Sequence, residues 1–186
     1  PAESTGIALV EIKDGVADIF HYAHIDVERT SDFEGDWCID LQKQLSLLIA
    51  DHEISHVTVE DYFFSKKFAK GCNLNAAYRT AIWIWCRQNN LPYTILNISE
   101  WKKFVAGRST ATNEQKAKWG KEPSKKLYMQ QALWDRWGFK FPNHSISNTT
   151  GKPILFRYDI VDAVAQAVYY ARIYANATKV TMSVPV

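Results

Sequence analysis

The most constraining feature of this sequence is the order in which its β-rich and helix-periodic segments follow one another. Two β-rich runs, 5–12 and 16–24, are joined by Lys13-Asp14-Gly15, and an Asp-Gly pair is a strong signal for a hairpin turn. Helical and strand patterns then alternate along the chain. The predicted helices cover 38–50, 73–89, 99–107, 124–137 and 160–177, and the predicted strands cover 57–59 and 91–98. This order predicts an α/β fold with a mixed β-sheet flanked by α-helices.

Three polar segments separate these patterns. The segment 24–36 is acidic, 108–122 is rich in Lys and small residues and is predicted to be a mobile loop, and 142–153 is rich in turn-forming residues. The sequence contains neither an internal repeat nor a linker, so its 186 residues predict a single domain, 1–186. A sheet built from these pieces lacks a partner on one side of the hairpin, and we therefore expect the first central strand to be missing from this chain.

Composition narrows the class of protein. Hydrophobic residues make up 47% of the chain and charged residues 23%, as in an ordinary globular protein. No apolar run approaches the ~18 residues that a membrane span needs, and no basic-then-apolar leader opens the sequence. The three cysteines are an odd number without CxxC spacing, which favours reduced thiols. We therefore expect a cytoplasmic protein without a membrane partner.

Charge is unevenly distributed along the chain. Between Trp101 and Lys140, ten Lys and Arg residues stand against three acidic residues, whereas the rest of the chain has twelve against seventeen. A basic segment on an otherwise acidic protein is typical of a surface that binds a polyanion such as nucleic acid. A solvated charged face is the alternative interpretation.

The stretch "HEISHVTVED", residues 52 to 61, contains patterns that point to two different metals. His52, Glu53 and His56 match HExxH, which in zinc peptidases places two histidines and a general base on one helix face. Here the β-branched run 57–59 follows at once, so the helical period has already ended. We interpret the match as an accident of a connection between a helix and a strand, and we rank a zinc peptidase last.

Three carboxylates favour magnesium instead. Glu60 closes an apolar strand, where its side chain can project from the end of a sheet. Asp159 and Asp162 are three residues apart at the start of the last predicted helix, which places them on one face. Compensation of the helix dipole is the simple explanation of these two acids. The alternative is that they share a cation, and oxygen ligands select Mg²⁺ or Mn²⁺.

Four segments stand out along the chain: "PAESTGIALVE" (1–11), "VTVEDYFF" (57–64), "WKKFVAGRST" (101–110) and "DIVDAVAQAVYYA" (159–171). In this order they resemble the RuvC-type Holliday-junction resolvases of the RNase H-like superfamily, which includes the retroviral integrases. The first segment resembles the family's D-P-x-x-x-T-G motif without its Asp, and the second resembles a strand that ends in a catalytic Glu. The third resembles the family's basic segment, and the fourth resembles its helix D-x-x-D-A-x-A-x-A.

The resemblance implies an RNase H-like fold and a structure-selective endonuclease that resolves four-way DNA junctions by two-metal-ion phosphodiester hydrolysis. Glu60, Asp159 and Asp162 would be the catalytic metal ligands for two Mg²⁺ ions, with Mn²⁺ as a possible substitute. The family's fourth acid would stand immediately before Pro1. We therefore expect the chain as given to bind metal poorly and to be inactive. Such an enzyme works on DNA in the nucleoid, or in the host cytoplasm if its source is viral.

The resemblance also implies the residues that contact DNA. Phe63 stands where the family places an aromatic side chain that stacks on unpaired bases, and Lys102 matches a phosphate-contacting lysine. A buried core position and a solvated surface are the respective alternatives. The remaining predicted phosphate contacts are Lys66, Lys67, Lys103, Arg108, Lys125 and Lys126.

The family resolves junctions as a two-fold dimer, so a homodimer is expected here, with the helix 73–89 at the interface. Trp83 and Trp85 are two residues apart and cannot face the same side of that helix. One of them could therefore be covered by a second subunit, or by another layer of the same chain.

Two further functions stay open alongside the junction resolvase. Another RNase H-like nuclease, acting on RNA–DNA hybrids or resembling a transposase, would keep the carboxylate chemistry and change the substrate. A non-catalytic DNA-binding module would account for the absent first acid.

Overall fold

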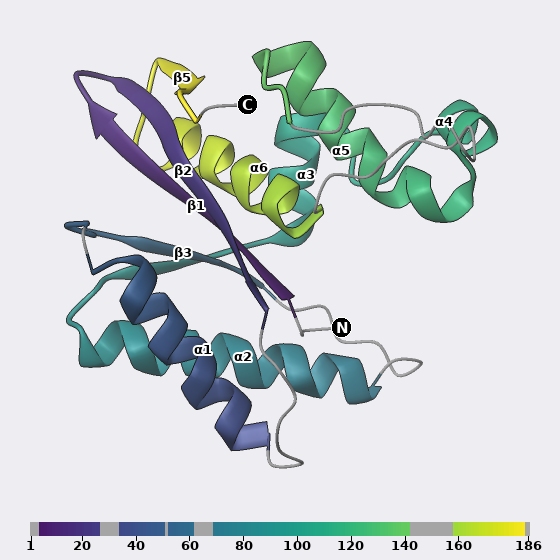
Figure 1. Cartoon of the computed structure of the whole chain (residues 1–186). Coiled ribbons are helices and arrows are strands. Elements are labelled where there is room, and N and C mark those ends of the chain that lie inside the picture. The colour runs from purple at the N-terminus through teal and green to yellow at the C-terminus, as the bar shows by residue number, and fades with distance from the viewer. Residues whose placement is uncertain (1–3, 27–33, 51, 62–68, 142–157, 185–186) are drawn as a thin grey trace. The chain divides into compact units, whose positions relative to one another are not determined.

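The computed structural model describes residues 4–26, 34–50, 52–61, 69–141 and 158–184. Helices and strands follow one another as shown in Figure 1. The elements are β1 (Ser4–Lys13), β2 (Val16–Asp26), α1 (Glu34–Leu48), β3 (Val57–Glu60), α2 (Ala69–Gln88), β4 (Tyr93–Leu96), α3 (Ile98–Ala106), α4 (Asn113–Trp119), α5 (Lys121–Trp137), α6 (Tyr158–Ile173) and β5 (Lys179–Met182).

The chain divides into two compact units. Unit 1 comprises residues 1–5 and 24–98, and unit 2 comprises residues 6–23 and 99–186. Each unit contains one sheet, β3-β4 in unit 1 and β1-β2-β5 in unit 2, where the outer ends of β1 and β2 extend into unit 1. The prediction of a single domain stays a prediction.

The sheet of unit 2 is mixed. Asp14 and Gly15 have φ angles of 51° and 75°, which suit the tight turn that makes β1 and β2 antiparallel neighbours. β5 runs parallel to β2, with Val16 opposite Lys179 and Ile19 opposite Met182. The predicted hairpin and the predicted mixed sheet are therefore both confirmed.

Helices α3, α5 and α6 supply most of the core of unit 2. α6 packs on α5 and on β5, and its buried face follows the predicted apolar period. Arg136 of α5 donates hydrogen bonds to the carbonyl oxygens of Phe104 and Val105, at 2.9 and 2.8 Å, and so caps the C-terminal end of α3. The fully buried side chains include Ile19, Trp101, Val105, Leu133, Val164 and Val168.

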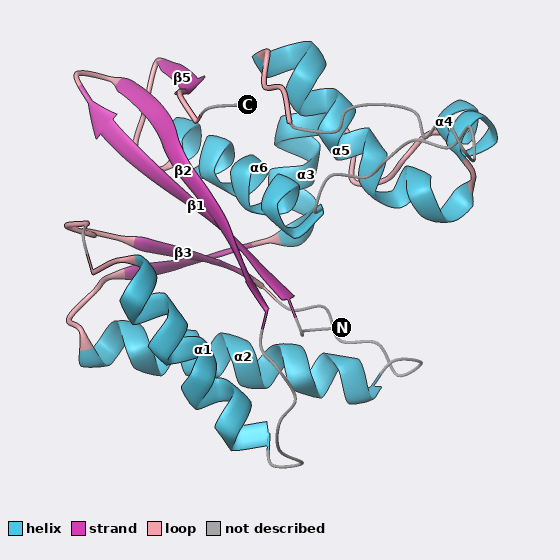
Figure 2. Ribbon diagram, viewed as in Figure 1, coloured by secondary structure: helices cyan, strands magenta, loops and turns pink. Residues whose placement is uncertain are grey.

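Unit 1 consists of a short parallel sheet and two helices. β3 runs beside β4, from Val57 opposite Tyr93 to Glu60 opposite Leu96 (Figure 2). α2 packs on β3 and on α1. Trp85 is buried in this unit and its indole Nε1 donates to Ser46 Oγ of α1 at 2.8 Å, whereas Trp83 is 47% exposed.

Two predictions of local structure were wrong. The segment 108–122 was predicted to be a loop, yet it contains α4, which starts with a capping box in which Thr112 and Gln115 bond to each other's backbone N–H. The last helix was predicted to reach 177, but α6 ends at Ile173 and β5 follows. Asn176 adopts a positive φ of 54° between them, which the helical conformation does not allow.

The other elements match their predictions with shifted starts. α1 begins at Glu34, inside the segment that was predicted to be a loop, and α2 begins at Ala69 instead of residue 73. Within the described ranges, none of the helices combines the length and the apolar content needed to traverse a lipid bilayer. Cys38 and Cys86, two of the three cysteines, are not joined in a disulfide.

Candidate metal and nucleic-acid site

Asp159 and Asp162 occupy the first turns of α6, as predicted. Both side chains are partly buried, and that of Asp162 is only 16% exposed. Acids at this end of a helix are favoured by its dipole. Helix position alone, however, does not account for placing one of the two carboxylates so far from solvent.

The start of α6 is fixed against β1 by a close approach of the two backbones. A Cβ atom at Gly6 would lie 1.9 Å from the carbonyl oxygen of Asp159, so only glycine fits at this position. Gly6 is the glycine of the T-G pair in the opening motif of the sequence. This motif therefore serves, at least in part, to seat the helix that carries the two acids.

Lysines surround the buried carboxylate. The ammonium Nζ of Lys126 lies 3.4 Å from Oδ2 of Asp162 and 4.5 Å from the centre of the Tyr158 ring. Lys102 of α3 contributes a second positive charge close enough to act on Asp162, and its own ammonium lies 4.9 Å from the ring centre of Trp101. Helices α3, α5 and α6 thus bring one acidic and two basic side chains together.

Burial dominates the electrostatics of Asp162. Loss of solvent raises the pKa of this carboxyl group, Lys126 and Lys102 oppose the rise, and the charge of Asp159 adds to it. Burial and the charge of Asp162 also raise the pKa of Tyr128, whose hydroxyl donates to the carbonyl oxygen of Ser109 at 2.9 Å. Tyr128 therefore stays protonated, and Asp162 binds its proton more tightly than an exposed carboxyl group does.

Glu60 is the last residue of β3, as predicted, and belongs to unit 1. The chain continues the ladder for one more residue, because the backbone N–H of Asp61 donates to the carbonyl oxygen of Leu96 at 2.9 Å. The Asp61 carboxylate pairs with Arg79 of α2, with 2.7 Å between Oδ1 and Nη1. The end of β3 is therefore tied both to β4 and to the middle of α2.

The predicted ligands lie in both units, Glu60 in unit 1 and the two aspartates in unit 2. In the described part of the chain, no three His, Cys, Asp or Glu side chains form a group that could hold a metal ion. The convergence of Glu60 with Asp159 and Asp162 stays a prediction. The residues nevertheless fit Mg²⁺ or Mn²⁺, because all the predicted donors are carboxylate oxygens.

The HExxH match has no zinc-binding geometry. Residues 53–56 are not helical and lead directly into β3. A ring nitrogen of His56, Nε2, lies 2.9 Å from the Thr94 hydroxyl, and burial lowers the pKa of this histidine. The interpretation of this segment as a connection is confirmed.

The predicted DNA contacts differ in their surroundings. Lys103, Arg108 and Lys125 are exposed. Lys102 and Lys126 are partly buried, and their charges oppose the rise in the pKa of Asp162 that burial causes. This second role of Lys102 and Lys126 was not predicted from the sequence, and neither was the pairing of Arg79 with Asp61. Both depend on residues far apart in the chain. The predicted contacts that lie outside the described residues are Phe63, Lys66 and Lys67.

Comparison with solved structures shows the same fold. The chain matches Thermus thermophilus RuvC in complex with a Holliday junction substrate at a TM-score of 0.60 and 16% identity, over 91% of this chain and 87% of that chain. A second structure of T. thermophilus RuvC matches at a TM-score of 0.57 and 16% identity, over 91% and 89%. The RNase H-like α/β fold predicted from the sequence is thereby confirmed. No protein-family model and no curated protein matches the sequence.

Proposed function

We propose that this chain is a structure-selective endodeoxyribonuclease that hydrolyses four-way DNA junctions with the help of divalent metal ions. Its fold is that of the RuvC structures, one of which holds a Holliday junction substrate. The single observation that carries the proposal is the partly buried Asp162 beside Lys126 and Lys102. A carboxyl group whose pKa is shifted by burial and by specific charged neighbours is a candidate functional group.

Glu60, Asp159 and Asp162 are the proposed ligands of two Mg²⁺ or Mn²⁺ ions. When bound, such ions would supply the positive charge that activates a water molecule and stabilises the leaving oxygen. The contribution of the chain itself is to hold the carboxylates in place. Gly6 and the β1 backbone seat the start of α6, while Asp61 and Arg79 fix the end of β3.

The basic residues of α3 and α5 are the proposed phosphate contacts. Lys103 and Lys125 are exposed on these two helices, and Arg108 is exposed immediately after α3. Phosphate contacts of this kind make binding strongly dependent on salt. A location in the cytoplasm, where chromosomal or viral DNA is processed, follows from this substrate.

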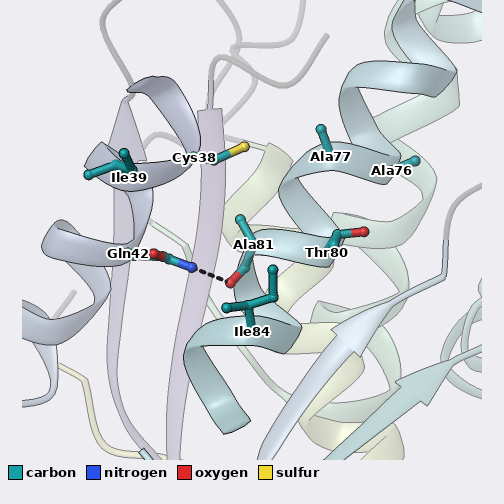
Figure 3. Close-up of a pocket in the computed structure, with 8 residues that line it drawn as sticks. All are labelled: Cys38, Ile39, Gln42, Ala76, Ala77, Thr80, Ala81 and Ile84. Carbon is teal, nitrogen blue, oxygen red and sulfur yellow. Dashed lines mark hydrogen bonds between the residues drawn. The ribbon is translucent and has the colours of Figure 1, made fainter. Parts of the chain in front are cut away.

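The proposed assembly is a two-fold homodimer formed through α2. A groove of about 510 Å³ lies between α1 and α2 (Figure 3). Gln42, one of the lining residues, donates to the carbonyl oxygen of Ala81 at 2.7 Å. Ile39 and Ile84 also line the groove and are 50% and 46% exposed. Small residues beside protruding isoleucines form a surface that can complement a second copy of itself. The small lining residues on α2 are Ala76, Ala77, Thr80 and Ala81.

Substitution in the groove tests the dimer. Ile84→Asp places a charge in an interface that the proposal makes apolar, and sedimentation equilibrium should then show monomers where the wild-type protein forms dimers. Leu47→Asp is the matched control, because Leu47 is 76% exposed on α1 and does not line the groove. Dimers of the Ile84→Asp protein, or monomers of the wild type, would contradict the proposed assembly.

Cleavage assays test the activity. The full-length protein should cut a synthetic four-way junction in Mg²⁺ and leave a linear duplex of the same sequence intact. Asp162→Asn should lower the cleavage rate by about 10³-fold or more while junction binding persists. Asp135→Asn on the exposed face of α5 is the control and should cut normally.

The same assay separates the alternatives. Cleavage of RNA–DNA hybrids with intact junctions would redirect the proposal to another RNase H-like nuclease. Junction binding without cleavage in any divalent ion would indicate a non-catalytic DNA-binding module.

A further inference from the structure

The side chain of Lys126 has two neighbours that favour its positive charge. Its ammonium lies 3.4 Å from the Asp162 carboxylate and 4.5 Å from the centre of the Tyr158 ring. The Lys126 side chain is 36% exposed, whereas the Asp162 side chain is only 16% exposed. The lysine therefore has a route from the carboxylate to the surface.

The distance to Asp162 indicates an exchangeable contact. A strong charge-assisted hydrogen bond brings N and O to about 2.7–2.9 Å, so 3.4 Å indicates attraction between charges without a tight bond. The aromatic face of Tyr158 can hold the ammonium by a cation–π interaction when it moves off the carboxylate. Leaving Asp162 therefore does not leave Lys126 without a favourable contact.

A divalent ion and the ammonium compete for the same carboxylate. An acid with little exposure to solvent is disfavoured when it loses the ammonium in contact with it, and the charge of Lys102 offsets this loss only in part. Two cations within a few ångströms of each other repel strongly at the low effective dielectric of a partly buried site. A divalent ion at Asp162 and Lys126 in its present place therefore weaken each other's binding.

We infer that Lys126 is the resident counter-ion of Asp162, which holds this carboxylate in place until a divalent ion binds and displaces the ammonium. The inference rests on the proposed function, because it gives Asp162 the role of a metal ligand. It makes Lys126 a positioning residue, and the displaced ammonium becomes available to a DNA phosphate. Metal binding and DNA binding are thereby coupled through one side chain.

Thermal unfolding of the full-length protein and its variants with and without Mn²⁺, in the absence of DNA, tests this role. Lys126→Met should unfold at a lower temperature than the wild type in metal-free buffer near pH 8, because the buried carboxylate has lost its counter-ion. Mn²⁺ should then raise its melting temperature by more than it raises that of the wild type. A tenfold gain in Mn²⁺ affinity corresponds to about 3–6 °C of additional stabilisation for a chain of this length. Lys121→Met, at an exposed position of α5, should respond to Mn²⁺ as the wild type does.

Other outcomes would overturn the inference. An equal fall in melting temperature with and without Mn²⁺ would make Lys126 a structural partner only, and no change in either condition would make it a phosphate contact only.

If Lys126→Met does not fold, Lys126→Arg provides the opposite test. A guanidinium group can bind the carboxylate with two hydrogen bonds, so the Mn²⁺ response should shrink. A wild-type protein without any Mn²⁺ response would contradict the proposed function as well, whereas a normal wild-type response isolates the failure to Lys126.

Discussion

Each of the two units contains an ion pair beside a predicted metal ligand. The pair with the shorter distance between its charged atoms is the more exposed of the two. Asp61 and Arg79 of unit 1 are 2.7 Å apart, and Asp61 is 41% exposed. Asp162 and Lys126 of unit 2 are 3.4 Å apart, and Asp162 is 16% exposed. Water screens the first pair, so its contribution to the free energy of unfolding is small despite the short distance.

Burial is therefore the property that distinguishes the two ion pairs. The Asp61–Arg79 pair ties the end of β3 to α2 and leaves both side chains in contact with solvent. The Asp162–Lys126 pair only partly offsets the loss of hydration, since the pKa of Asp162 remains raised. The ion pair of unit 1 thus anchors the end of the strand that carries Glu60, whereas the lysines of unit 2 only partly compensate the burial of Asp162.

The largest expected effect comes from the contact that seats α6. Gly6→Ala should destabilise the protein by about 3 kcal/mol or more, because the new methyl group meets the Asp159 carbonyl oxygen at 1.9 Å and backbone on both sides must shift. Urea unfolding measures the loss.

Hydrogen exchange locates the same loss. Protection should fall at α6 and β1 in unit 2 and persist at α2 and β3 in unit 1. Wild-type stability of Gly6→Ala, or a uniform loss of protection in both units, would contradict the separate roles given to the two halves.

The sequence contained the signals for most of this fold. The Asp14-Gly15 turn, the strand that ends at Glu60 and the stop at Gly138 follow from local chemistry, and all are observed. α4 could also have been predicted, because Thr112 and Gln115 have the spacing of a capping box. The small polar residues around them were instead interpreted as a loop.

The environment of the site could not be predicted in this way. Lys126 and Asp162 are 36 residues apart, and their contact depends on how α5 packs on α6. Sequence patterns identify an acid at the start of a helix but do not give its exposed fraction. The strand β5 was missed for a related reason, because its pairing with β2 is a long-range contact of a four-residue segment.

The next effect concerns the pH dependence of stability. A carboxyl group whose pKa is raised by folding destabilises the folded state once it ionises, so this penalty is absent at acidic pH and grows as pH rises through the raised pKa. Asp162→Asn removes the penalty. In metal-free buffer at neutral pH it should raise the melting temperature by on the order of 5 °C, and the gain should vanish near pH 4.

Scanning calorimetry over this pH range checks the prediction. Asp135→Asn serves as the control, since its exposed carboxylate should give no such gain. A melting temperature of Asp162→Asn below that of the wild type at neutral pH would show that the ion pair with Lys126 outweighs the burial of the acid.

The smallest effect is expected at the exposed pair. Arg79→Met should lower the free energy of unfolding by only about 0.2–1 kcal/mol. Junction cleavage at saturating enzyme should fall more than junction affinity does, because the end of β3 that carries Glu60 has lost its tie to α2.

An exchange of charges isolates this pair. Asp61→Arg combined with Arg79→Asp should restore much of the cleavage rate, while Arg87→Met, at an exposed position of the same helix, should leave it unchanged. Equal losses of cleavage rate in Arg79→Met and in the charge-exchanged variant would contradict a positioning role for the Asp61–Arg79 pair.

The central claim is that acids from both units hold the same divalent ions. The most direct measurement is the Mn²⁺ affinity of Glu60→Gln, Asp162→Asn and the double variant, obtained from the electron paramagnetic resonance signal of free Mn²⁺. Each single variant should bind about tenfold more weakly or worse, and the double variant should lose little beyond the larger single loss, since the two residues act as one site. Independent losses that add in free energy, or an unchanged affinity of Glu60→Gln, would place the two acids in separate sites and contradict the account.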